Sequence, residues 1–190
     1  MDTSEALSEE QLKEHEHYMR EALNEAEKAI NSGEVPIGCV IVYNGNIIGR
    51  GHNLRNNLKN PLCHAEISAI NEAANFIGDW RLEDCTLYVT VEPCPMCAAA
   101  IVQARIPNVV FGTRNVKAGC AGSILNILDE PRFNHQVNVI EGILREECAK
   151  PMGEFFKRFR KKADVYKRQS VHCALNIVAI NNCHAHSWLR

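Results

Sequence analysis

The sequence predicts an α/β protein with a mixed sheet of about five strands and helices on both faces. A β-rich run at 37–43 leads through Asn44 and Gly45 into a second run at 46–52, and Asn-Gly is the dipeptide most typical of a tight hairpin. The first run is apolar almost throughout, as in a strand covered on both faces. After this hairpin, β-rich runs alternate with helical patterns, and this alternation defines the layered α/β class.

An amphipathic helix is predicted before the hairpin. Ser8 and Gln11 form the pattern of a capping box, and apolar residues then recur at helical spacing. Gly33 follows as a C-cap. We therefore expect a first helix that covers one face of the sheet.

A second helix is predicted after the polar loop that follows the hairpin. Because the residue before a proline is disfavoured in the helical region, Pro61 predicts that this helix starts at 62–63. His64 then falls in its first turn, and the apolar spacing ends near Phe76. A buried strand is predicted at 85–91.

The remaining elements are predicted from shorter patterns. They are a helix, two strands and a final helical region, at 93–105, 108–112, 137–140 and 143–162. The loop-rich stretch between the two strands is expected to hold one helical turn at 123–128. Pro151 should break or kink the final helical region.

The length is consistent with one domain, since 190 residues can bury a continuous core. We expect residues 1–163 to form this domain and 164–190 to be a C-terminal tail outside the fold, because the tail is unlike the rest in composition. No apolar run approaches the roughly 18 residues that a transmembrane helix needs. We therefore expect no membrane contact.

Charge is distributed unevenly along the chain, although the net charge is only −2. Residues 1–34 carry ten acids against three bases, whereas 145–168 carry nine bases against four acids. The basic segment is consistent with nucleic-acid contact. A solvated helix face explains the same charges, and charge alone does not separate the two interpretations.

The cysteine content favours a reducing compartment. There are nine cysteines, an odd number, and no signal-peptide pattern precedes them. Because disulfides are rare in the cytosol, we expect a cytoplasmic protein with free thiols.

Two short stretches predict a metal site. His64 precedes Ala65-Glu66, and Cys94 and Cys97 lie about thirty residues later. One imidazole and two thiolates are ligands that Zn²⁺ prefers, and three protein ligands leave the fourth tetrahedral position open for water, as in catalytic zinc sites. Glu66 would then lie beside the metal without binding it, where it could carry protons to and from that water.

Two other interpretations fit parts of this pattern. A Cys-x-x-Cys pair alone could be a redox pair, but a dithiol needs no His-Ala-Glu at a second helix start. A closed structural zinc site would need a fourth ligand, for which Cys63 and Cys120 are the nearby candidates. We favour the catalytic site and keep the structural site as the alternative.

The motifs resemble those of a known family in order and in approximate spacing. The segments that carry the resemblance are 51–53, 64–67, 87–94, 96–98, 110–112, 122–123 and 154–156. Together they resemble the bacterial tRNA-specific adenosine deaminases, within the cytidine and deoxycytidylate deaminase superfamily, from about residue 18 to residue 162. This resemblance implies a cytidine-deaminase-like three-layer fold.

The resemblance also implies a reaction. Members deaminate the wobble adenosine of tRNA, position 34, to inosine with one Zn²⁺ per subunit, and they work as homodimers on the tRNA anticodon stem-loop. By analogy, Asn53 and the Ala65 N–H would hold the base, and the Pro93 carbonyl would face the metal-bound water or the departing amine. Pro36 and Ile37 would form an apolar wall.

RNA contacts are implied for three segments. The 154–162 segment combines cations such as Arg158 and Arg160 with aromatics such as Phe156, although ordinary core packing explains phenylalanines as well. Two further stretches resemble loops that meet the anticodon stem-loop in the family, and their residues are Arg114, Asn115, Lys117, Asn134 and His135.

One residue departs from the family pattern. Asn115 lies where many relatives have aspartate, so a negative charge near the nucleic-acid backbone is missing, and this would widen tolerance for other single-stranded substrates. Two rival functions remain from the sequence: deamination of a free nucleobase or nucleotide, such as guanine, cytidine or deoxycytidylate, and a non-catalytic zinc module.

Overall fold

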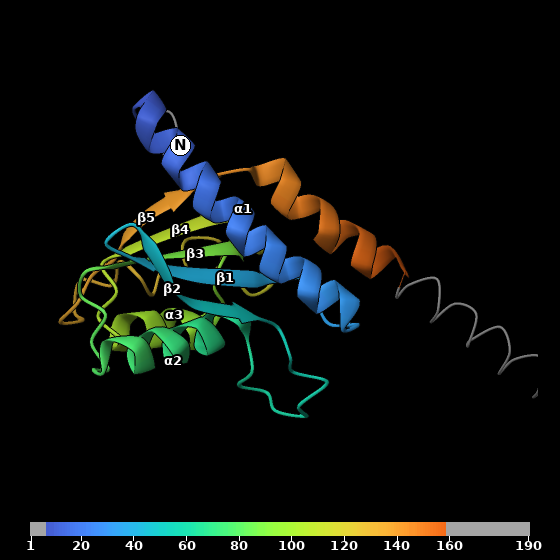
Figure 1. Cartoon of the computed structure of the whole chain (residues 1–190), viewed down its shortest axis with the longest axis horizontal. Coiled ribbons are helices and arrows are strands. Elements are labelled where there is room, and N and C mark those ends of the chain that lie inside the picture. The colour runs from blue at the N-terminus through green and yellow to red at the C-terminus, as the bar shows by residue number, and fades with distance from the viewer. Residues whose placement is uncertain (1–6, 159–190) are drawn as a thin grey trace, which may run out of the picture. The chain divides into compact units, whose positions relative to one another are not determined.

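The computed structural model describes residues 7–158, and five strands of this part form one mixed sheet (Figure 1). The helices and strands are α1 (Glu9–Asn31), β1 (Gly38–Tyr43), β2 (Asn46–His52), α2 (Ala65–Ile77), β3 (Cys85–Val91), α3 (Pro95–Gln103), β4 (Asn108–Thr113) and β5 (Asn138–Glu141). The strand order is β2-β1-β3-β4-β5. Strand β1 is antiparallel to β2 and β3, whereas β3, β4 and β5 are parallel.

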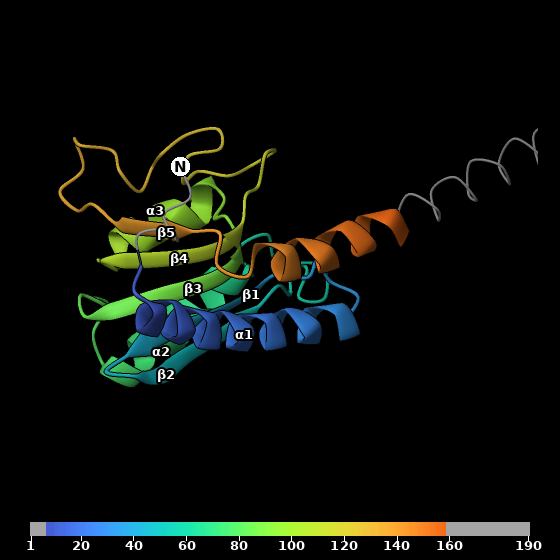
Figure 2. The same ribbon diagram turned by 90° about the horizontal axis from the view of Figure 1, so that it is seen from above.

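Helices cover both faces of the sheet, as the sequence predicts. Helix α1 lies on one face, and α2 and α3 lie on the other (Figures 1 and 2). Because successive side chains of a strand point to opposite faces, β1 contributes to two cores. Cys39 and Ile41 pack in the core on the side of α2 and α3, and Val40 and Val42 pack in the core under α1.

The hairpin between β1 and β2 has the predicted tight turn. Asn44 and Gly45 have φ angles of 48° and 73°, and positive φ at both central residues is the requirement of a type I′ turn. The Tyr18 hydroxyl donates to the Gly45 carbonyl at 2.9 Å. This bond fixes the turn to α1, whose predicted capping box at Ser8 and Gln11 is also present.

Two glycines of β2 allow α2 to lie close to the strand. A Cβ at Gly51 would overlap the Ala65 carbonyl in the first turn of α2, and one at Gly49 would overlap the Ala69 carbonyl. Helix α2 therefore lies directly on the backbone of β2. This close approach determines where the N-terminus of α2 meets the edge of the sheet.

The predicted start of the second helix, at 62–63, is two to three residues too early. Helix α2 begins at Ala65, and His64 is its N-cap in extended conformation. The preceding residues form turns instead, because the Leu62 N–H donates to the Asn60 side chain and the Cys63 N–H donates to the Asn60 carbonyl. His64 therefore lies at the boundary of the helix rather than inside its first turn.

The predicted helical turn at 123–128 is wrong. Ala121 and Asn126 form an isolated antiparallel bridge, and Gly122 has a φ of 124°. The Ser123 N–H and hydroxyl both donate to Glu92. These long-range bonds hold the segment in an irregular loop and outweigh its local helical preference.

The final helix does not break at Pro151. Helical conformation extends from residue 145 to 158, the last residue described. A proline removes one intrahelical hydrogen bond, and the helical conformation continues through this position in spite of that loss. The contacts divide the chain into two compact units, Met1–Met152 and Gly153–Arg190.

Residues 164–190, expected as a tail, lie outside the described residues, so the predicted boundary after residue 163 stays a prediction. Within residues 7–158, no helix combines the length and the apolar character that a membrane crossing requires.

Candidate active site

Two helix N-termini converge at one edge of the sheet. Strand β3 ends at Val91, and the chain passes through Pro93 to Cys94, the N-cap of α3. His64 is the N-cap of α2 on the same face. In open α/β sheets, ligands bind outside the carboxyl ends of parallel strands, so this edge is where a site is expected.

The predicted metal ligands lie together at this edge. His64 Nδ1 is 3.6 Å from Cys94 Sγ and 3.6 Å from Cys97 Sγ. Zinc bonds of about 2.0–2.1 Å to nitrogen and 2.3 Å to sulfur at a tetrahedral angle separate the two donors by about 3.5–3.6 Å. The three side chains therefore fit Zn²⁺ in both chemistry and spacing.

Among the described residues, no fourth protein donor joins the three predicted metal ligands. The group of donors within 4.8 Å of one another consists of His64, Cys94 and Cys97, and neither Cys63 nor Cys120 belongs to it. A closed structural zinc site needs four ligands. The geometry therefore favours the catalytic type of site.

The surroundings favour a thiolate at Cys94. Hydrogen bonding with Cys97, supported by His64, lowers the pKa of Cys94 to about 4 although burial opposes this shift. The interaction with Cys94 and burial raise the pKa of Cys97. Both sulfurs lie at the positive N-terminal end of α3, which also stabilises a thiolate.

Glu66 is buried beside these donors without joining them. It lies in the first turn of α2 and is only 3% exposed. Burial raises the pKa of its carboxyl to about 6. A carboxyl whose pKa approaches neutrality can both take up and release a proton, as general acid–base catalysis requires.

The residues expected to hold the base also gather at this edge. Asn53 follows β2 directly, is 5% exposed, and donates its backbone N–H to the Ile37 carbonyl. Pro36 is buried next to Ile37. Ala65 is the first residue of α2, and the first N–H groups of a helix have no intrahelical acceptor.

A buried glutamate that the sequence analysis missed fixes Asn53. Glu34 is 0% exposed, and its Oε2 accepts from Asn53 Nδ2 at 3.3 Å and from Asn56 Nδ2 at 3.0 Å. Glu34 Oε1 accepts from the Asn57 N–H at 2.7 Å. Because an ionised carboxylate only accepts hydrogen bonds, the amide of Asn53 must turn its NH₂ group toward Glu34.

The Pro93 carbonyl already has one partner. It accepts from the Cys120 N–H at 2.9 Å, and a carbonyl oxygen has a second lone pair. Its predicted contact with water or amine at the metal stays a prediction.

Of the residues expected to bind RNA, those after β4 lie at the edge of the site. Arg114 forms an ion pair with Glu141 at 2.7 Å. The Asn115 side chain accepts from the backbone N–H groups of Lys117 and Ala118, at 3.4 and 3.2 Å. These contacts order the loop and leave Lys117 exposed.

Asn134 and His135 lie near the opposite end of α3. Asn134 accepts from Arg105 at 2.7 Å, and His135 Nε2 lies 2.8 Å from the Ile106 carbonyl. Arg105 and Ile106 follow the C-terminus of α3, whose N-terminus carries the cysteines. The structure does not bring this pair together with the metal donors.

The basic C-terminal segment is described only in part. Phe156 and Arg158 are exposed, and the Phe156 ring contacts the Phe155 ring edge-on at 5.5 Å. Arg160 lies outside the described residues. The exposure of Phe156 differs from what ordinary core packing would give.

Comparison with known proteins identifies the class. Residues 13–160 match the family model described as MafB19-like deaminase. A tRNA-specific adenosine deaminase of Bacillus subtilis is 54% identical over 147 residues, which cover 77% of this chain and 91% of the relative. The chain therefore belongs to the tRNA-specific adenosine deaminase family.

Solved structures agree with this assignment. A structure from a study of A-to-I editing by tRNA:A34 deaminases at the wobble position of transfer RNA superposes with a TM-score of 0.69 and 40% identity, covering 71% of this chain and 98% of the other. A guanine deaminase from Nitrosomonas europaea has a TM-score of 0.64 at 21% identity, covering 74% of this chain and 83% of the other. The second likeness extends to the fold alone.

Proposed function

We propose that this chain converts the wobble adenosine of a tRNA to inosine by hydrolysis, with release of ammonia. The observation that carries this proposal is the convergence of His64, Cys94 and Cys97 beside the buried Glu66. The 54% identity to a tRNA-specific adenosine deaminase supports adenosine in tRNA as the substrate.

One Zn²⁺ per chain would be held by His64, Cys94 and Cys97. A bound zinc ion acts as a Lewis acid that lowers the pKa of water toward neutrality. The spacing of the three donors, at 3.6 Å from nitrogen to each sulfur, supports this assignment.

Glu66 would carry the protons. Its carboxylate takes a proton from the attacking water and delivers it to the ring nitrogen next to the reacting carbon. A second transfer through the same carboxyl protonates the amine, which leaves as ammonia. The burial of Glu66 supports this role, because burial raises the pKa of the carboxyl to about 6.

The base would be held by Asn53 and the Ala65 N–H, with Pro36 and Ile37 as the apolar wall. The Pro93 carbonyl would face the metal-bound water or the departing amine. Asn53 is supported by its burial and by Glu34, which fixes its amide. No described residue donates to the Asn53 side-chain oxygen in the hydrogen bonds of the structure. A buried polar group with an open bonding position suits a ligand contact.

The anticodon stem-loop would contact the loop after β4, and the basic C-terminal segment is a separate candidate for RNA contact. Arg114, Asn115 and Lys117 follow the strand end at the site. Exposed Phe156 and Arg158 offer stacking and phosphate contact, and Arg160, Asn134 and His135 stay predicted contacts.

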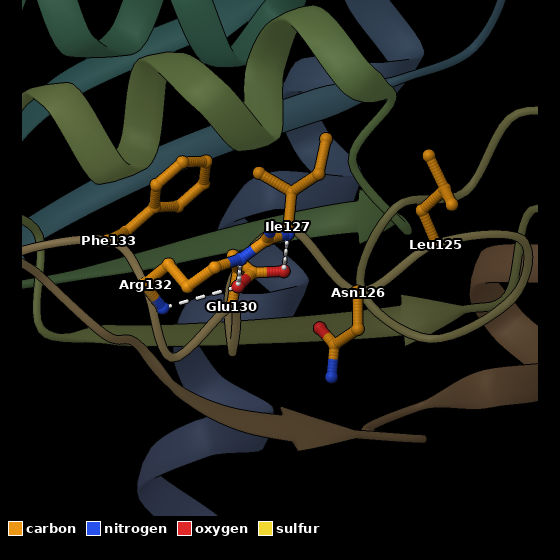
Figure 3. Close-up of a pocket in the computed structure, with 6 residues that line it drawn as sticks. All are labelled: Leu125, Asn126, Ile127, Glu130, Arg132 and Phe133. Atoms are coloured by element: carbon orange, nitrogen blue, oxygen red, sulfur yellow. Dashed lines mark hydrogen bonds and ion pairs between the residues drawn. The ribbon is translucent and has the colours of Figure 1, made fainter.

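A second copy of the chain would complete the assembly. Large apolar side chains are exposed at Leu58, Leu62, Phe76 and Trp80. Exposed Leu125 and Phe133 line a pocket beside the Glu130–Arg132 ion pair (Figure 3). Where exposed apolar side chains form one patch they often mark an interface, and a monomer in sedimentation at micromolar concentration would count against a homodimer.

We also place the enzyme in the cytoplasm. The seven cysteines of the described part are all free, as a reducing compartment allows.

One assay separates this function from its rivals. Zinc-loaded protein is incubated with an anticodon stem-loop carrying adenosine-34, and separately with adenosine, guanine, cytidine and deoxycytidylate, and released ammonia is measured. We expect activity on the stem-loop and none on free adenosine, because much of the binding energy comes from flanking nucleotides. Activity on guanine alone would show that the tRNA substrate is wrong, while the deamination mechanism would stand. Inactivity on all five compounds would favour a structural zinc module.

A further inference from the structure

Glu92 is a further buried carboxylate at the edge of the sheet that carries the metal donors, and no step of the proposed reaction uses it. It lies between the end of β3 and Pro93-Cys94, and it is 2% exposed. Its Oε1 accepts from the Ala121 N–H at 3.0 Å and the Ser123 N–H at 2.9 Å. Its Oε2 accepts from the Asn115 N–H at 2.9 Å and from the Ser123 hydroxyl.

The donors all come from one loop, residues 115–123, which wraps around the carboxylate. Gly119 lies against it so closely that a Cβ at this position would overlap the Glu92 side chain. Four donors on one buried carboxylate make strong, charge-assisted hydrogen bonds. The Glu92 side chain, which follows the end of β3, therefore binds three residues of the loop at once.

The same loop is tied to the metal-binding segment by its backbone. The Cys120 N–H donates to the Pro93 carbonyl at 2.9 Å, one residue before Cys94. Next to the loop, Arg114 pairs with Glu141 at the end of β5. The loop is thus anchored at both of its sides, while Lys117 stays exposed.

We infer that Glu92 is a positioning residue that locks the 115–123 loop against the metal edge in the conformation that receives RNA. This inference rests on the proposed function, because it assigns the loop to the anticodon stem-loop. Glu92 itself has no contact with the substrate in this account. Its substitution should therefore weaken RNA binding more than it slows the chemical step.

The test uses two variants that attack the same contact from opposite sides. Glu92→Gln replaces an acceptor by an NH₂ group, which faces N–H donors and cannot accept from them. Gly119→Ala leaves the carboxylate intact and pushes the loop away from it. The matched control is Glu83→Gln, the same chemical change in an exposed turn before β3.

Three quantities are measured for zinc-loaded full-length protein. They are the zinc content, the rate of amide hydrogen exchange in 115–123, and the single-turnover rate of stem-loop deamination as the enzyme concentration is varied. For Glu92→Gln and Gly119→Ala we expect faster exchange and a half-saturating concentration raised about tenfold, with the maximal rate changed less than about threefold. Zinc content should stay equal to that of the wild type. Ser123→Ala, which keeps the backbone bonds, should show the same pattern more weakly and covers the case in which the stronger variants do not fold.

Two results would overturn the inference. The first is unchanged exchange and unchanged concentration dependence in folded Glu92→Gln. The second is a loss of activity that follows a loss of zinc, which would make Glu92 a support for Cys94 alone. A wild-type protein that neither binds nor deaminates the stem-loop would defeat the proposed function, and the exchange measurement would still decide whether Glu92 anchors the loop.

Discussion

Three buried glutamates at the metal edge differ in what surrounds their oxygens. Glu34 accepts three hydrogen bonds from the loop after β2, and Glu92 accepts four from the loop after β4. Glu66 instead faces the metal donors, with Cys97 as its neighbour. A carboxylate whose two oxygens both accept hydrogen bonds from a loop fixes that loop. A carboxylate without such a set of donors is able to exchange protons.

The first prediction concerns Glu66. Glu66→Ala should retain one zinc per chain and lose at least about a hundredfold in the single-turnover rate, because the glutamate moves protons and does not bind the metal. Metal analysis and stem-loop deamination check this. Retention of zinc by Cys97→Ala together with its loss from Glu66→Ala would reverse the assigned roles.

The second prediction concerns Glu34. Glu34→Gln replaces one of the two acceptor oxygens by an NH₂ group, so the loop that carries Asn53 loses at least one of its three bonds to Glu34. We expect kcat/KM to fall about tenfold, and the effect should be strongly non-additive with Asn53→Ala. Glu27→Gln on the exposed side of α1 is the matched control and should behave as wild type. Additive effects in the double mutant would show that Glu34 does not act through Asn53.

Among single residues, the sequence predicts the ones that belong to compact motifs. His64, Glu66, Cys94 and Cys97 are recognised because their spacing has a chemical reason, and three of them form the grouped donors. Glu34 stands in no motif, and Glu92 lies in the 87–94 motif, which does not reveal that its carboxylate binds the 115–123 loop. An isolated glutamate carries no pattern, and its burial is decided by loops distant in the chain.

Among the elements, those with strong local signals follow the sequence closely. Strand β3 spans Cys85–Val91 as predicted, and the hairpin and the capping box of α1 are confirmed. The errors lie where long-range hydrogen bonds outweigh local preference. The clearest case is 123–128, where Ser123 donates to Glu92, a residue that lies 31 positions earlier, just after β3.

The third prediction concerns the packing of α2 on β2. Gly51→Ala places a Cβ against the Ala65 carbonyl and should lower the free energy of unfolding by about 1–3 kcal/mol. Because His64 precedes Ala65, zinc affinity should fall as well. Denaturant unfolding and metal titration measure both effects.

A matched control is Gly153→Ala, where nothing lies within 4 Å of the new Cβ. It should be neutral or stabilise the protein by up to about 1 kcal/mol, because alanine favours a helix. Equal destabilisation by both changes would show that contact between α2 and β2 is not the cause.

At the scale of the whole molecule, the fold brings the metal donors, Glu66 and the loop proposed to receive RNA from distant segments to one edge. The N-termini of α2 and α3 carry the metal donors, and the carboxyl ends of β3 and β4 lead into Glu92 and the 115–123 loop. The layered architecture was predictable from alternating patterns. The order of the strands decides which loop meets which buried glutamate. This pairing is not revealed by the sequence.

The fourth prediction concerns the C-terminal segment. Truncation after Lys162 should leave the thermal midpoint, zinc content and kcat/KM unchanged, because we expect 164–190 to lie outside the deaminase domain. Calorimetry and stem-loop kinetics on the truncated and full-length chains check this. A large loss of stability or activity would show that the domain includes these residues.

The central claim is that this site deaminates the wobble adenosine of a tRNA, and the most direct measurement is nucleoside analysis of the RNA after reaction. Zinc-loaded protein is incubated with a stem-loop carrying adenosine at position 34 and with a matched stem-loop whose adenosine is moved to a neighbouring loop position. The account predicts inosine in the first RNA, little or none in the second, and none in either RNA with Glu66→Ala. No inosine from fully metallated wild-type protein, or equal inosine in both RNAs, would contradict it.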